Sequence, residues 1–190
     1  MGMQILFVIT SHRRSGVART LMGSVAREVA SWAQVPTLVF RLPSAVTPQM
    51  QAAQYTILVL LDESLFAESA LPSTIALART LDATLVLFEV LPSPSAAVLY
   101  DRELLERAEK YLHQQCDQLT AQAISARMRI SIGDPATQIV ERAQEPNNGC
   151  DLIVVTIHAC TGLDRLCIGG VADEVFRHTQ LPLMILHPAE

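Results

Sequence analysis

The chain has 190 residues, of which 50% are hydrophobic and 17% are charged, and its formal net charge is −5. That length allows one or two domains, and the acidic balance argues against a general nucleic-acid-binding protein. No apolar run approaches the roughly 20 residues of a membrane helix, and the start lacks the basic and apolar regions of a secretory signal. The four cysteines have no C-x-x-C spacing, which indicates reduced thiols in a cytoplasmic protein without membrane contacts.

The first predicted elements come from an internal repeat. Residues 5–40 align without a gap on residues 151–186, at a constant offset of 146 positions from Gly23 to Gly169. The identical pairs include Thr10 and Thr156, His12 and His158, Val29 and Val175, and Pro36 and Pro182. The alignment predicts a strand at Ile5–Ile9, a helix at Gly23–Trp32 and a strand at Thr37–Phe40. We interpret residues 1–42 as the last third of one unit, residues 43–54 as a linker and residues 55–190 as a complete unit.

Strand-like runs alternate with helical spacing along the complete unit. The predicted elements are a strand at Thr56–Leu61, a helix at Phe66–Leu81, a strand at Thr84–Val90, a helix at Val98–Ala123, a strand at Arg127–Ile132, a helix from Pro135 to about Glu145, a strand at Asp151–Thr156, a helix at Gly169–Arg177 and a strand at Leu183–Leu186. Asp134 is placed to cap the third of these helices. Five strands separated by helices predict a parallel sheet with right-handed crossovers.

Three segments of the complete unit carry a family resemblance. YTILVLLDESLFAESALPSTIALARTLDATLVLFEVLPSP opens it, GDPATQIVERA enters the third helix, and the last segment resembles the glycine signature G-x-x-G-x9-G-[ST]. Together they resemble a universal stress protein domain. The resemblance implies a flavodoxin-like, adenine-nucleotide alpha-hydrolase-like α/β fold with strand order 3-2-1-4-5. Some members of the family bind ATP, and others dimerise without it.

The expected nucleotide site lies where the strand order reverses, at the carboxyl ends of the first and fourth strands. Asp62 ends the first strand and is either a ribose or metal contact or a cap for the helix that begins near Ser64. Gly169 and Gly170 begin the fourth helix, whose free N–H groups suit a phosphate, although a tight turn also explains them. We expect the base to lie against Val90.

The signature is incomplete in this chain. Its first two glycines fall on Thr156 and Ala159, its final Ser/Thr falls on Gly170, and Glu63 replaces the glycine usual after Asp62. We therefore expect a degenerate site for ATP or AMP with Mg²⁺.

The N-terminal copy keeps the helix-start pair Gly23 and Ser24, and Arg13 and Arg14 could hold an anion beside it. It has no first strand of its own, so it cannot build a complete nucleotide site by itself.

The leading functional hypothesis is a non-catalytic stress-response protein that acts through nucleotide sensing or dimerisation. Thr156, Ala159 and Glu63 favour an alternative, a nucleotide-independent dimerisation or interaction module. A third alternative is a phosphate-ester or adenylate hydrolase, including a weak ATPase, but the sequence holds no P-loop lysine, metal-ligand cluster or nucleophile–base pair. His12, His158, Cys160 and Cys167 are interpreted as ordinary loop residues, and we expect no resident metal.

The N-terminal strands predict association. By analogy with dimers of the family, strand 37–40 should pair antiparallel with strand 183–186, within or between chains. Strand 5–9 then lies at the far edge of the sheet, and an apolar edge of that kind invites a second copy. We therefore expect a homo-oligomer, most simply a dimer.

Overall fold

The computed structural model describes residues 5–12, 28–30, 33, 35–42, 54–93, 102–145, 149–157, 170–179 and 181–187. Its strands are β1 Phe7–His12, β2 Thr37–Leu42, β3 Thr56–Leu60, β4 Thr84–Leu91, β5 Ala126–Ile132, β6 Leu152–Thr156 and β7 Leu183–Leu186. Its helices are α2 Leu65–Glu68, α3 Leu71–Leu81, α4 Arg102–Ala121, α5 Pro135–Ala143 and α6 Gly170–His178.

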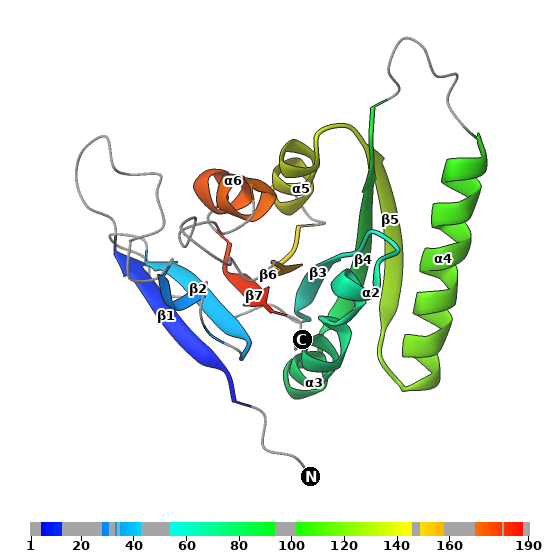
Figure 1. Cartoon of the computed structure of the whole chain (residues 1–190). Helices are drawn as coiled ribbons and strands as arrows, with labels where there is room; N and C mark the ends of the chain where they lie inside the picture. Colours follow the sequence, from blue (N-terminus) through cyan, green and yellow to red (C-terminus); the bar gives the residue numbers. More distant parts are fainter. Residues whose placement is uncertain are drawn as a thin grey trace.

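The strands form one sheet in the order β1-β2-β7-β6-β3-β4-β5 (Figure 1). Counted from β3, its five C-terminal strands are parallel and follow the order 3-2-1-4-5, so the predicted fold class is confirmed. The sheet differs from a five-stranded one because β1 and β2 extend it beyond β7. The contact between β2 and β7 is its one antiparallel pair among the described strands.

That antiparallel contact was predicted, and the structure confirms it within a single chain. Thr37 lies opposite Ile185, Leu38 opposite Met184, and Val39 opposite Leu183. Strand β1 then lies parallel to β2 at the outer edge, with Phe7 opposite Thr37.

Helices lie on both faces of the sheet (Figure 1), and an apolar cluster fills each of the two layers. Helices α5 and α6 pack on one face through Ile139, Val175 and Phe176, whereas α3 and α4 pack on the other through Ala78 and Leu112. Strand β3 serves both layers, because Leu58 faces the first and its neighbours Ile57 and Val59 face the second. Burial on both faces explains why the strands read as continuous apolar runs.

Several predicted boundaries need correction. The single helix expected at Phe66–Leu81 is divided into α2 and α3 around Ser69 and Ala70. Pro72 explains the break, because proline has no N–H for a helical hydrogen bond and is accommodated in the first turn of a new helix. Helix α4 ends at Ala121, and Ala123 has a left-handed φ of 59° that does not continue a helix.

The cap predicted at Asp134 is confirmed. Its Oδ1 accepts hydrogen bonds from the backbone N–H of Thr137 at 2.9 Å and from the Thr137 hydroxyl at 2.7 Å. These bonds hold the pKa of the Asp134 carboxyl below its usual value. Of the helix predicted at 23–32, the structure describes residues 28–30, which are helical. The start of the helix predicted from Val98 and the linker at 43–53 lie outside the described residues.

Candidate functional site

A cleft of about 270 Å³ opens at the carboxyl ends of β3, β4 and β6. Strand β3 lies between β4 and β6, so the crevice is at the point where the strand order reverses. Its apolar walls come from the strand ends and from α2, α5 and α6, and include Phe66, Phe88, Ile139, Val155 and Val171. A concave, mostly apolar crevice with few polar groups is typical of a small-molecule site.

The structure brings three of the predicted site residues into this cleft. Asp62, Val90 and Thr156 all line it, each from the end of a different strand of the sheet. Gly170 begins α6, and the next residue, Val171, also lines the cleft. Ala159 and Gly169 lie outside the described residues, as do the four candidate anion contacts of the N-terminal copy, Arg13, Arg14, Gly23 and Ser24.

Asp62 is exposed and organises the start of α2. Its Oδ1 accepts hydrogen bonds from the backbone N–H of Ser64 at 3.1 Å and from the Ser64 hydroxyl. The Ser64 oxygen in turn accepts from the backbone N–H of Ala67 at 3.1 Å and is the cap of the helix. The direct cap is therefore Ser64, which Asp62 positions, while the Asp62 carboxylate also stands at the wall of the cleft.

Glu63 stands directly after Asp62, at the position where glycine is usual in the family that the sequence resembles. Its φ of 63° lies in the left-handed region, which disfavours residues with a Cβ. Its carboxylate forms an ion pair with Nε of Arg107 on α4 at 2.9 Å. The negative charge of Glu63, which was expected at the approach to the cleft, is thus partly neutralised by Arg107, 44 positions further along the chain.

Sequence reasoning missed Glu89, which stands in the middle of β4. It is only 5% exposed, and its Oε2 has no hydrogen-bond partner in the described part of the chain. Burial, assisted by the nearby Glu63 and Asp62 carboxylates, raises its pKa to about 7, although Arg107 acts in the opposite direction. The feature of the sequence that could have pointed to a buried Glu89 was a single carboxylate within the apolar run TLVLFEV.

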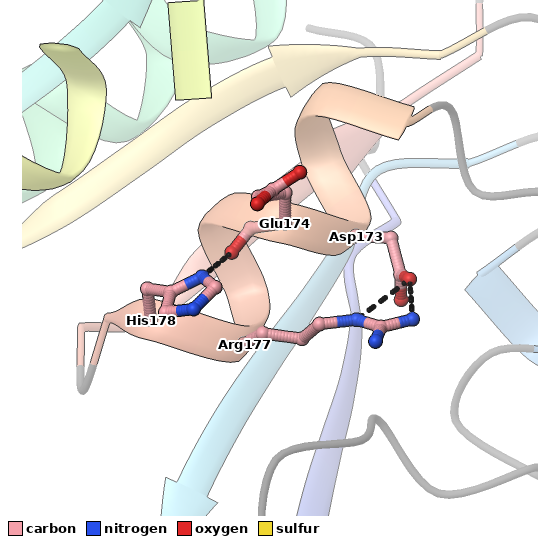
Figure 2. Close-up of polar contacts among 4 residues, drawn as sticks. All are labelled: Asp173, Glu174, Arg177 and His178. Atoms are coloured by element: carbon pink, nitrogen blue, oxygen red, sulfur yellow. Dashed lines mark hydrogen bonds and ion pairs between the residues drawn. The ribbon is translucent and has the colours of Figure 1, made fainter. Parts of the chain in front are cut away.

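The N-terminus of helix α6 lies at the cleft, and charged side chains stand in the first two turns of the helix. A Cβ added to Gly170 would meet no described atom within 4 Å, so packing against those atoms does not require glycine there. Asp173 lies in the first turn and pairs with Arg177 one turn later, with Nε to Oδ2 at 3.0 Å (Figure 2). A carboxylate in that turn opposes anion binding, and Arg177 offsets it.

Figure 2 also shows the end of α6, where Nδ1 of His178 contacts the Glu174 carbonyl oxygen at 2.9 Å. Arg177 and His178 in the last turn suit the helix dipole. Among the described residues, no cluster of three or more His, Cys, Asp or Glu side chains is placed to hold a metal ion. None of the helices described is long and apolar enough to cross a membrane.

The fold and the cleft define an α/β protein with a crevice at a topological switch point. Residues 55–187 match the family described as the Universal stress protein family, and the chain belongs to that family. A universal stress protein of Methanocaldococcus jannaschii is 27% identical over 99 residues, which cover 52% of this chain and 57% of that protein.

Solved structures show the same fold. A universal stress protein from Archaeoglobus fulgidus has a TM-score of 0.69 at 18% identity over 97% of this chain and 61% of its own. A putative universal stress protein from Pseudomonas aeruginosa has a TM-score of 0.66 at 19% identity over 96% of this chain and 63% of its own. The chain therefore spans about three-fifths of these relatives. A universal stress protein in complex with cAMP has a TM-score of 0.55 at 22% identity over 73% of this chain and 100% of its own.

Proposed function

We propose that the chain is a non-catalytic, cytoplasmic stress-response protein that binds an adenine nucleotide weakly in the cleft at the carboxyl ends of β3, β4 and β6. The observation that carries the proposal is the convergence of Asp62, Val90 and Thr156 on one crevice at the switch point. The structure of a family member in complex with cAMP supports an adenine nucleotide as the ligand class.

The chemistry of the cleft assigns a place to each part of the ligand. The base would pack on the apolar wall formed by Val90 and Phe88, and the ribose or a phosphate-bound Mg²⁺ would lie near Asp62. The phosphates would lie near Gly169 and Gly170, where the N-terminus of α6 points its free N–H groups. Among the described residues that line the cleft, Asp62 is the one that would supply a carboxylate to the metal.

Two features keep the affinity low. Thr156 is half-buried and β-branched, and it stands where the signature has a glycine that lets the ligand approach the backbone. Asp173 adds negative charge to the turn that would face the phosphates. These same features favour the alternative of a nucleotide-independent interaction module.

Isothermal titration calorimetry with ATP–Mg²⁺, AMP and cAMP separates the two functions. Combining Thr156→Gly, Ala159→Gly and Glu63→Gly restores the two missing signature glycines and the glycine usual after Asp62, and we expect the affinity for a nucleotide to rise at least tenfold. A variant with Thr120→Gly, an exposed position on α4, is the control for the added glycine. No gain in the triple variant would show that these departures do not limit binding.

Residues 1–42 are proposed to be the end of a second, truncated unit, and the strand register supports this. Phe7 lies opposite Thr37 in β1 and β2, and Ile153 lies opposite Leu183 in β6 and β7, again 146 positions on. Leu38 and Met184, which are equivalent in the repeat, lie opposite each other. The strand pair β1–β2 and the strand pair β6–β7 are thus related by a local two-fold axis that passes between Leu38 and Met184.

We place the predicted self-association at the edge of β1. The β2–β7 contact that joins dimers of the family is already made within this chain, so it is not available to a second copy. Among the strands that the structure describes, β1 has a neighbour on one side only. The association was predicted through strand 5–9, but the edge strand spans Phe7–His12, so the pairing edge is β1 itself. Edge pairing of two copies through β1 gives a homodimer as the simplest assembly, and light scattering at micromolar concentration tests it.

A further inference from the structure

One short segment forms a wall of the cleft and also contacts helix α4. This α2 segment, residues 62–68, runs from the end of β3 through helix α2. Its residues Asp62, Phe66 and Ala67 line the cleft. The segment turns at Glu63, whose left-handed φ of 63° disfavours a residue with a Cβ. The backbone is thus strained at the turn, and contacts with the rest of the fold hold the segment in place.

Two of those contacts come from α4. Nε of Arg107 lies 2.9 Å from a carboxylate oxygen of Glu63. Further along α4, Nε2 of Gln115 donates a hydrogen bond to Oε1 of Glu68 at 3.1 Å. Two carboxylates of the α2 segment therefore link the wall of the cleft to α4.

Glu89 lies on the α4 side of the sheet, next to these carboxylates. Its neighbours along β4, Phe88 and Val90, line the cleft, so the alternation of a strand directs the Glu89 side chain to the opposite face. There it is 95% buried, being 5% exposed, and its Oε2 has no hydrogen-bond partner in the part of the chain that the structure describes. A carboxylate in that position has no bonded group that compensates for the loss of water.

Carboxylates predominate around Glu89. The charged or titratable groups near it come from the α2 segment and from α4: Asp62, Glu63, Glu68, Arg107 and Tyr111. Burial raises the pKa of Glu89 to about 7, and the Glu63 and Asp62 carboxylates assist. Arg107 acts in the opposite direction. Burial, with Glu68 next, raises the pKa of Tyr111, so its phenol stays neutral near pH 7.

We propose that a proton on Glu89 switches the cleft between a closed form, which binds a nucleoside, and a looser form, which binds it more weakly. Loss of the proton places a third negative charge beside Asp62 and Glu63, and like charges repel most strongly where water is excluded. The α2 segment then moves away from the sheet and takes Phe66 and Ala67 out of the cleft wall. The proposal rests on the proposed function and names the regulation of that same site.

Adenosine is the probe, because the second ionisation of a phosphate, at about pH 6, would mask that of Glu89. A pKa difference of about one unit between the two positions of the α2 segment limits the change in affinity to about tenfold. In calorimetric titrations the parent chain should therefore bind adenosine about threefold to tenfold more weakly at pH 8.5 than at pH 5.5. Titrations at pH 7 in buffers of different ionisation enthalpy should show that binding takes up protons.

Matched variants assign the effect to one side chain. Glu89→Gln should bind adenosine equally at both pH values and take up no proton, whereas Glu109→Gln, on the exposed side of α4, should behave like the parent. Without ligand, the amide chemical shifts of Phe66 and Ala67 should follow one transition near pH 7 in the parent and none in Glu89→Gln. Arg107→Gln should move that transition to higher pH, because it removes the cation that lowers the pKa of Glu89.

The proposal is overturned if the affinity of the parent is the same at both pH values, or if Glu89→Gln keeps the dependence. It is also overturned if the Phe66 and Ala67 amides do not titrate, or if Arg107→Gln leaves their transition in place. Failure of adenosine and AMP to bind at either pH would count against the nucleotide cleft itself, and the amide transition would then decide whether Glu89 moves the α2 segment.

Discussion

The buried carboxyl of Glu89 makes the stability of the fold depend on pH. Its pKa rises from an ordinary value of 4.5 to about 7, mainly because it is buried in β4. Each tenfold change in an ionisation constant is worth about 1.4 kcal/mol, so the folded chain favours the protonated side chain by about 3 kcal/mol. Because the folded-state pKa is the higher one, this contribution is present in full below pH 4.5. It is lost as the pH rises from 4.5 through 7.

The perturbation that tests this is Glu89→Gln, which keeps the shape and removes the charge. The free energy of unfolding in urea should equal that of the parent chain near pH 5 to within about 1 kcal/mol, the cost of an imperfectly bonded amide. At pH 8 the variant should be more stable than the parent by about 2 kcal/mol, after that cost. Glu109→Gln, on the exposed side of α4, is the control and should leave the pH dependence unchanged.

Equal slopes of stability against pH in the parent and in Glu89→Gln would refute the reasoning. The cause would then be a well-solvated Glu89 carboxylate, or one whose repulsion by Glu63 and Asp62 is fully offset by Arg107.

Three further predictions concern stability and reactivity. Glu63→Gly should stabilise the chain by up to about 1 kcal/mol, because glycine accepts the left-handed φ and the lost ion pair is open to solvent at Arg107, whose side chain is 65% exposed; a loss of stability in urea would contradict this. Leu112→Ala should destabilise by about 2–5 kcal/mol, since Leu112 is fully buried, whereas Leu65→Ala, at an 83% exposed position, should change little. Cys150 is buried with its pKa raised to about 12, so iodoacetamide at pH 8 should modify it only after unfolding, and equal rates in both states would be the adverse result.

Much of the fold could be predicted because its signals are local. Strand β7 was predicted with its observed bounds, since four consecutive apolar residues follow a proline. The antiparallel partner of β7 was predicted by analogy with dimers of the family, because the repeat identifies strand 37–40 as the equivalent of strand 183–186. The division between α2 and α3 was missed although Pro72 was visible, because apolar spacing on both sides of it reads as one continuous helix.

The candidate site was predictable in position but not in its electrostatics. Asp62, Val90 and Thr156 each end a strand, and the carboxyl ends of parallel strands meet at one edge, so their convergence follows from topology. The pairing of Glu63 with Arg107 joins residues 44 positions apart through the docking of α4, which no local pattern specifies. The burial of Glu89 likewise depends on that docking.

The most direct test of the central claim, a nucleotide site at the strand-order reversal, is a calorimetric titration of AMP into three chains. The parent chain should give saturable heat, and Thr156→Arg should abolish it by filling the cleft that Thr156 lines. Thr120→Arg makes the same change at an exposed position of α4 and should bind like the parent. Equal heat in all three chains would place AMP elsewhere, and the absence of saturable heat in the parent at millimolar AMP would contradict the nucleotide site itself.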